Sequence, residues 1–115
     1  MTQTIDDLDP EDAKLATLAR SARARIEAAE GAAVRDTDGR TYAAATVELP
    51  SLSVTATQAA IIAAVSSGAE SIEAAVIVSD FPGIATASLS AVQDLNPDAP
   101  IYVVDSAGAV VERLP

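Results

Sequence analysis

The chain has 115 residues, 17 acidic side chains against 7 basic ones, and a formal charge of −10. It contains no cysteine and no histidine, which excludes disulfides, thiolate nucleophiles, Ser-His triads and zinc sites with nitrogen and sulfur ligands. So acidic a chain is also a poor partner for nucleic-acid phosphates, because their binding depends on Lys and Arg. We therefore expect a single domain with no cofactor, no bound metal and no nucleic-acid partner.

The composition predicts a globular protein with a thin core. Apolar residues make up 50% of the chain but aromatic residues only 3%, so Leu, Ile, Val and Ala must fill the interior. Small domains with weak cores often gain stability by self-association, and we expect a homodimer or a homotetramer. The acidic start lacks the basic-then-apolar order of a signal peptide, and the longest apolar run, 59–65, is far shorter than the roughly 20 residues of a membrane span. These features predict a cytoplasmic protein with no membrane partner.

The first expected elements are an acidic N-terminal tail over residues 1–9 and a helix over 10–28, which opens a single domain over 10–115. Asp9 can cap this helix, and Pro10 suits its first turn. Apolar residues then recur at helical spacing, at Leu15, Leu18, Ala22 and Ile26.

Two strands are predicted next, over 31–35 and 40–47. They flank Asp36–Gly39, whose Asp and Gly residues are typical of a hairpin turn. The stretch Leu49–Ser51 contains a proline and is expected to break the second strand. The pattern therefore predicts an antiparallel pair.

The second half of the chain alternates helices and strands. Thr55 to Gln58 has the Thr-x-x-Gln form of a capping box, and the helix over 56–66 is apolar nearly all round, which predicts burial on most sides. A strand over 74–79 is apolar on both faces, as in a sheet covered on two sides. The remaining expected elements are a helix over 85–95 with Ala85, Leu89, Val92 and Leu95 inward, and strands over 101–104 and 110–114 around a turn at 105–108.

The element order αββαβαββ predicts an α/β fold. Strand–helix–strand units force parallel neighbours in the middle of the sheet. We expect a mixed five-stranded sheet with helices on both faces.

Several stretches resemble a known family in their order and spacing. The sequence reads EGAAVR over 30–35, TDGRTY over 37–42 and VE at 47–48. The short, homotetrameric type of cytidine deaminase reads Val-Gly-Ala-Ala-Val, Asp-Gly-x-x-Tyr-x-Gly and Asn-x-Glu-Asn over the same part. The similarity continues through 52–54, 59–68, 74–79 and 96–105 and covers residues 11–115. It implies a three-layer cytidine deaminase-like fold.

The catalytic groups of that family are replaced here. The family uses three Cys or His ligands to hold a zinc ion that activates a water, and a Glu that transfers protons. The resemblance places the first ligand at Thr55 and the Glu at Thr57, and it places the other two ligands at Ala85 and Ser88. Hydroxyls are poor zinc ligands. The resemblance therefore implies a divergent homologue that is not an enzyme, because it lacks the zinc ligands and the catalytic Glu.

The same resemblance marks a remnant pocket. The ribose contacts of the family, an Asn and a Glu, match Thr46 and Glu48. The expected pocket positions are Thr46, Glu48, Thr55, Thr57, Asp80, Ala85 and Ser88. Two helix N-termini should converge there, and their free N–H groups favour anions. Either the hydroxyls cap these helices and the pocket is closed, or the N–H groups hold a small polar or anionic ligand such as a nucleotide.

Three functions stay open at this point. The first is a catalytically inactive homologue acting as an interaction or structural module. For it the resemblance implies a link to ribosome assembly, because proteins of this look in high-GC bacteria tend to be encoded near a ribosome-assembly GTPase. The second is a nucleoside- or nucleotide-binding protein that uses the remnant pocket. The third is a metal-independent enzyme with Asp80 or Glu48 as its ionisable group. The Ala-rich face of the helix over 56–66 can pack on its own sheet or against another subunit.

Overall fold

The structure, a computed structural model, describes residues 2–115. Its helical elements are η1 (Ile5–Asp7, a 3-10 turn), α1 (Pro10–Arg25), α2 (Ala56–Ser66) and α3 (Thr86–Leu95). Its strands are β1 (Glu30–Asp36), β2 (Thr41–Ala45), β3 (Val47–Leu49), β4 (Leu52–Val54), β5 (Ile72–Ser79), β6 (Ile101–Val104) and β7 (Val110–Leu114).

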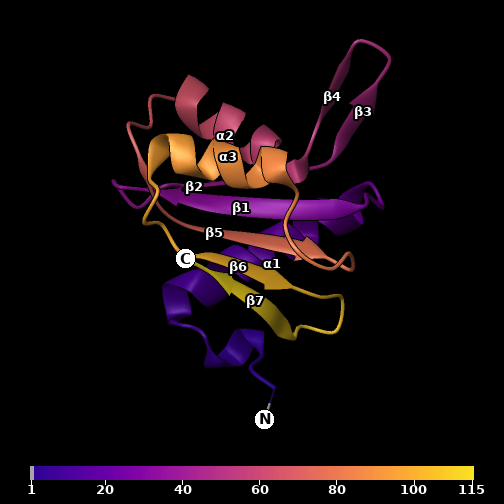
Figure 1. Cartoon of the computed structure of the whole chain (residues 1–115), viewed down its shortest axis with the longest axis vertical. Coiled ribbons are helices and arrows are strands. Elements are labelled where there is room, and N and C mark those ends of the chain that lie inside the picture. Colours follow the sequence, from indigo (N-terminus) through magenta and orange to yellow (C-terminus); the bar gives the residue numbers. More distant parts are fainter. Residues whose placement is uncertain (1) are drawn as a thin grey trace.

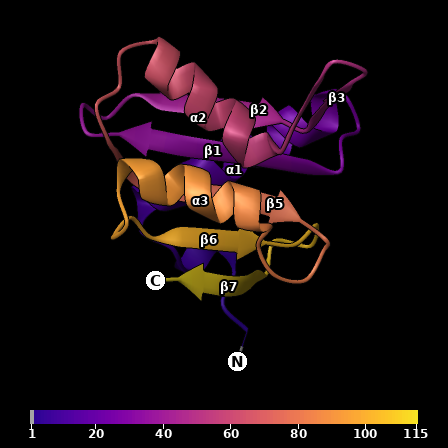
Figure 2. The same ribbon diagram turned by 45° about the horizontal axis from the view of Figure 1, so that its top comes forward.

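Five of these strands form one mixed sheet in the order β2-β1-β5-β6-β7. Strand β1 pairs antiparallel with β2 and β5, β5 runs parallel to β6, and β7 closes the far edge antiparallel to β6. Helix α1 covers one face, and α2 and α3 lie side by side on the other (Figure 1 and Figure 2). The predicted three-layer α/β architecture is confirmed.

Strand β5 separates two apolar cores, as its sequence predicts. Successive side chains of a strand point to opposite faces, and both sets are buried here. One set packs under α2 and α3, where the core includes Val34, Ala60, Ala75, Ile77 and Val92. The other set packs under α1, where the core includes Leu15, Ala74, Val76, Val78 and Tyr102.

Helix α1 begins as predicted and ends earlier. Asp9 caps it by accepting a hydrogen bond from the Glu11 amide at 3.2 Å. The expected end at residue 28 is wrong. The helix stops at Arg25, because Glu27 adopts a φ of 51°, a left-handed conformation that cannot continue an α-helix. Ile26, expected on the inner face, is exposed, so no burial favours a further turn.

Small residues let α1 lie directly on β1. A Cβ atom on Gly31 would stand 2.1 Å from the carbonyl oxygen of Ala19 and 2.8 Å from the Cβ of Arg23. Only glycine fits this position without moving the helix. Small residues such as Gly31 and Ala19 therefore allow the backbones of α1 and β1 to lie in close contact.

Residues 3–8, within the expected acidic tail, are held against the last hairpin of the sheet by hydrogen bonds. The Ile5 amide donates to the Gly108 carbonyl at 3.0 Å, and the Val110 amide donates to the Gln3 carbonyl at 2.8 Å. The two apolar side chains of the segment, Ile5 and Leu8, pack against the α1 core. These two apolar side chains attach the segment to the domain, although its acidic composition suggested a tail.

The two-stranded hairpin of β3 and β4 was not expected from the sequence. The strand expected over 40–47 ends at Ala45, and the break expected at Leu49–Ser51 is the turn of this separate antiparallel pair. The hairpin projects from the body of the molecule (Figure 1). Its strands are too short for an alternating pattern to be recognised.

The outer sides of α2 and α3 also differ from expectation. The α2 residues that are buried on its own sheet include Ala56, Ala60 and Ala64. Ile62 is 54% exposed and Val65 48% exposed, because α2 covers the sheet with one face only. On α3 the residues that pack inward include Leu89, Val92 and Leu95. Ala85 precedes that helix and is exposed, so its expected inward position is wrong.

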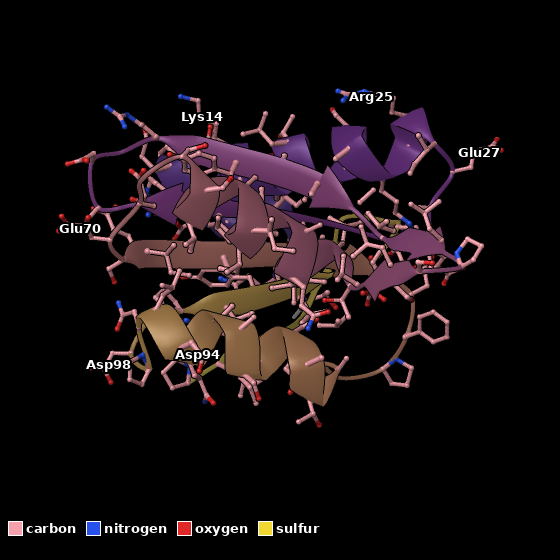
Figure 3. The ribbon with its side chains drawn as sticks, turned by 90° about the horizontal axis from the view of Figure 1, so that it is seen from above. Lys14, Arg25, Glu27, Glu70, Asp94 and Asp98 are labelled. Carbon is pink, nitrogen blue, oxygen red and sulfur yellow. The ribbon has the colours of Figure 1, made fainter. Side chains whose placement is uncertain are left out.

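Charged side chains lie around the outside of this body. Figure 3 shows Lys14 and Arg25 at the α1 side and Asp94 and Asp98 at the α3 side, all pointing outward. Over residues 2–115, none of the helices has the length and apolar character needed to cross a membrane.

Candidate functional site

An open cleft with a volume of about 610 Å³ lies where α2 and α3 begin, at the foot of the β3–β4 hairpin. The two helices run side by side with their first turns at the same end of the molecule (Figure 2). The predicted pocket residues that line the cleft are Thr46, Glu48, Thr55 and Ala85. This volume lies within the roughly 300–1,000 Å³ of pockets that bind small molecules.

The start of α2 is held by the predicted capping box. The Thr55 hydroxyl accepts a hydrogen bond from the Gln58 amide at 3.1 Å, and the Gln58 side-chain oxygen accepts one from the Thr55 amide at 3.0 Å. Both side chains therefore satisfy backbone groups that the helix leaves free at its N-terminus. The backbone amide of Gln58 is therefore not available to an anionic ligand.

A hydrogen bond between side chains joins the two helix starts. Ser88, which is 2% exposed, donates from its Oγ to the Oγ1 of Thr55 at 2.9 Å. Ala85 stands at the N-cap of α3 and supplies no side-chain acceptor. The N-cap side chain of α2 therefore accepts a hydrogen bond from the first turn of its helix, whereas the N-cap side chain of α3 accepts none.

Thr57 lies in the first turn of α2 and is completely buried. Its Oγ1 has no hydrogen-bond partner among residues 2–115. An unpaired buried polar group costs about 1–3 kcal/mol of stability. Thr57 is not among the residues that line the cleft, so its hydroxyl is enclosed by protein rather than presented to a ligand.

The two expected ribose-contact positions have different roles. The Thr46 hydroxyl accepts a hydrogen bond from the Glu30 amide at 3.1 Å and donates to the Glu30 carbonyl at 3.4 Å, so it is occupied by the backbone of β1. Glu48 lies opposite Ser53 in the hairpin and is exposed. Within residues 2–115 its carboxylate makes no hydrogen bond or ion pair. Glu48 is thus a free acceptor at the cleft.

The structure places Asp80 toward α1 and outside the cleft. Its carboxylate accepts hydrogen bonds from the Ser106 hydroxyl and from the Ser106 amide at 3.0 Å, and it pairs with the Arg23 guanidinium at 3.2 Å. The hydrogen bonds from Ser106, together with Arg23, outweigh burial and hold the pKa of Asp80 below its ordinary value. The Asp80 carboxylate is therefore held ionised at neutral pH, as a hydrogen-bond acceptor for Ser106 and an ion-pair partner of Arg23.

The cleft residues that were not expected from the sequence include Glu30, Gln58 and Phe81. Gln58 was recognised only as a helix cap, and Glu30 only as the first residue of the EGAAVR stretch, directly before the expected strand over 31–35. Phe81 had a usable signal, because a lone aromatic side chain next to a Pro-Gly turn is expected in an exposed loop.

Comparisons with known proteins agree with this fold. A family model described as cytidine deaminase-like matches residues 8–108. This chain belongs to the cytidine deaminase-like family. Among solved structures, the cytidine deaminase of Burkholderia pseudomallei has a TM-score of 0.77 and 21% identity over 88% of this chain and 89% of that chain. The cytidine deaminase of Mycobacterium leprae has a TM-score of 0.65 and 20% identity over 84% of this chain and 88% of that chain. No curated protein matches.

The zinc ion that cytidine deaminases use does not fit the residues of this cytidine deaminase-like chain. At the ligand positions implied by the resemblance, Thr55 and Ser88 present neutral hydroxyls that hydrogen-bond to each other, and Ala85 presents a methyl group. Zinc in proteins is bound by thiolate, imidazole and carboxylate groups. Within residues 2–115 there is no cluster of three or more Asp or Glu side chains that could hold a metal ion.

Proposed function

We propose that this protein is a non-catalytic member of the cytidine deaminase-like family that binds a nucleoside in its open cleft. One observation carries the proposal: the cleft is open while Thr55 and Ser88 hydrogen-bond to each other where zinc ligands are expected. Hydrolytic deamination of a pyrimidine needs a metal-activated water. The hydroxyl pair offers no ligand of the kind that holds such a metal. Of the two expected ribose-contact positions, Glu48 keeps the residue type of the family and lies at the cleft, whereas Thr46 and the positions of the reacting groups carry other residues.

The charge of the cleft favours a neutral ligand over a phosphorylated one. The lining includes the acidic side chains of Glu30 and Glu48 and no Lys or Arg, in a chain with a formal charge of −10. Like charges repel, and the Gln58 amide that could bind a phosphate is used by Thr55. We therefore propose nucleosides rather than nucleotides, with Glu48 accepting hydrogen bonds from ribose hydroxyls.

Isothermal titration calorimetry of the purified protein with cytidine, uridine and cytidine monophosphate tests this function. We expect saturable binding of both nucleosides, binding of the monophosphate at least about tenfold weaker, and no ammonia from cytidine. Glu48→Gln should weaken nucleoside binding about tenfold, because hydrogen bonds to a charged group contribute about 1.5–3 kcal/mol.

Glu70→Gln is the matched control, since Glu70 is exposed in the loop after α2, away from the helix starts (Figure 3). It removes the same charge and should leave nucleoside binding unchanged. Ammonia release from cytidine at an enzymatic rate would overturn the non-catalytic assignment. Failure of both nucleosides to bind would overturn the ligand assignment.

A second function, as an interaction module, has independent support from exposed apolar side chains. Leu49 and Leu52, at the tip of the hairpin, are 58% and 53% exposed. Ile62 and Val65 are exposed on the outer side of α2. Exposed apolar side chains of this size are often covered by protein contacts, and we propose a cytoplasmic homodimer or homotetramer that covers these residues.

Light scattering coupled to size-exclusion chromatography tests the assembly. The paired changes Leu49→Ser and Leu52→Ser should lower the measured mass if the hairpin is an interface. Val111→Ser is the control, because Val111 is an exposed apolar residue on the opposite edge strand. A monomeric wild-type protein would contradict the proposal.

The link to ribosome assembly predicts co-sedimentation with ribosomal particles, and a protein that stays in the supernatant would contradict it.

A further inference from the structure

Phe81 is exposed at the rim of the cleft in a chain that has very few aromatic residues. The sequence contains one Phe, two Tyr and no Trp. Tyr102 is buried and Tyr42 is half-buried, whereas Phe81 is 65% exposed and lines the cleft. It is the aromatic side chain of this molecule that a ligand in the cleft can reach.

The loop that carries Phe81 is anchored where it leaves β5. The Phe81 amide donates a hydrogen bond at 3.1 Å to the hydroxyl of Ser79, which is buried. The neighbouring Asp80 is tied to Ser106 and Arg23 by the contacts described above. The aromatic ring therefore stands next to two anchored residues. Its exposure comes from the end of a central strand rather than from a free segment.

The cleft has two unlike walls. One wall is polar and comes from the hairpin and the start of α2, where Glu48, Ser53 and Thr55 lie. The other wall is apolar and comes from the loop before α3, with Phe81 and Ile84. A nucleoside has the same division, because its sugar carries hydroxyls and its base presents planar faces.

We propose that Phe81 selects the ligand of the cleft by stacking on its aromatic base. The inference rests on the proposed function and adds the residue that recognises the base. Asp80 is a positioning residue in this arrangement, because it holds the strand end from which Phe81 projects. Stacking of a base on an aromatic side chain contributes about 1–3 kcal/mol by alanine substitution, which corresponds to roughly a tenfold effect on affinity or more.

The test compares three ligands, cytidine, uridine and free ribose, by calorimetry on four proteins. Phe81→Leu keeps an apolar side chain and removes the ring, so it should weaken both nucleosides about tenfold and leave ribose unchanged. Phe81→Tyr keeps the ring and should retain wild-type affinity. Val111→Ala is the control, because Val111 is an exposed apolar residue on the edge strand β7, which does not line the cleft.

A fluorescence measurement gives a second readout that does not depend on affinity alone. Since the chain contains no Trp, Phe81→Trp creates a single tryptophan emitter at the rim. Its emission should be quenched saturably by cytidine and not by ribose. Adding Asp80→Ala to this variant should reduce the quenching at saturation, because the ring is then no longer held in one position.

The outcomes separate this inference from the function beneath it. Nucleoside binding that Phe81→Leu retains at full affinity would overturn the role of Phe81 and leave the proposed function standing. Absence of nucleoside binding by the wild-type protein would overturn both. A change in molecular mass caused by Phe81→Leu, with unchanged affinity, would assign Phe81 to a subunit contact instead.

Discussion

The α1 side of the sheet and the cleft end of the α2–α3 side differ in how some of their polar groups are paired. On the α1 side, Arg35 pairs with Asp12 at 3.1 Å and with Glu73 at 2.9 Å. On the α2–α3 side, within the described part of the chain, the Glu48 carboxylate has no partner and the buried Thr57 hydroxyl makes no hydrogen bond. The N-cap residue of α3 also contributes no side-chain hydrogen bond.

Ion pairs and close backbone contact hold α1 to the sheet. At the cleft end, the exposed Glu48 carboxylate is open to solvent, whereas the buried Thr57 hydroxyl lowers stability without facing the cleft. Four variants test this contrast, and their expected effects decrease in the order given.

The largest effect should come from rebuilding a metal site at the cleft end. Thr55→Cys, Ala85→Cys and Ser88→Cys together place three thiols at the two converging helix starts, and three protein ligands suffice for a zinc site with one open position. The free energy of zinc binding at structural thiolate sites is on the order of 10 kcal/mol, so we expect this variant to bind zinc tightly. Zinc content after purification, and titration with Co²⁺ followed by thiolate-to-cobalt absorption, measure the binding.

A variant with Thr55→Cys, Ala85→Cys and Ser90→Cys is the control, because Ser90 is exposed on α3. Equal zinc affinity in the two triple variants would show that these positions do not keep the geometry of a metal site.

The next effect concerns the α1 face. Gly31→Ala should destabilise the protein by about 3 kcal/mol or prevent folding, because its Cβ would overlap the Ala19 carbonyl. Gly39→Ala is the comparison: this glycine has a φ of 84° and open space around it, so the change should cost about 1–2 kcal/mol from the left-handed backbone alone. Urea unfolding measures both. Similar losses in the two variants would contradict the close contact of α1 with β1.

A pH-dependent effect is expected at the β1–β2 turn. Burial opposes ionisation of Asp36, but hydrogen bonds from the Arg40 amide, the Tyr42 hydroxyl and the Asp38 amide outweigh it and hold the pKa of Asp36 below its ordinary value. A depressed pKa stabilises the fold above the unfolded value of about 3.9, and this stabilisation is lost as pH falls through the folded value. The stability gap between wild type and Asp36→Asn should therefore shrink below pH ~4.

Urea unfolding at neutral pH and at several acid pH values measures this gap. A gap that stays constant through the acid range would show that the ionised carboxylate contributes nothing specific.

The smallest effect should come from the unpaired hydroxyl. Thr57→Val removes the buried Oγ1 while keeping the shape of the side chain, and it should raise the free energy of unfolding by about 1 kcal/mol. Thr17→Val is the control, because Thr17 is exposed on α1, and it should change stability by less than about 0.5 kcal/mol. Destabilisation by Thr57→Val would mean that the hydroxyl has a partner, such as an ordered water.

Features built from neighbouring residues were predictable from the sequence alone. The capping box of α2 joins positions three apart in the chain. The unbroken apolar run of β5 predicts by itself that both faces of this strand are buried. The lack of Cys and His is a property of composition, and it settled which metal ligands the chain can offer. The order of the three α-helices and of the five strands of the main sheet then followed, because each of these elements shows its period over a few residues.

The cleft depended on contacts that no local pattern contains. Ser88 reaches Thr55 across 33 positions of the chain, and Arg23 reaches Asp80 across 57. The first contact occupies the hydroxyls at the expected ligand positions, and the second draws Asp80 out of the predicted pocket. The exposure of Phe81 and the projection of the β3–β4 hairpin arise in the same way. Which side chains share a space is set by how the layers pack, and packing is a property of the whole chain.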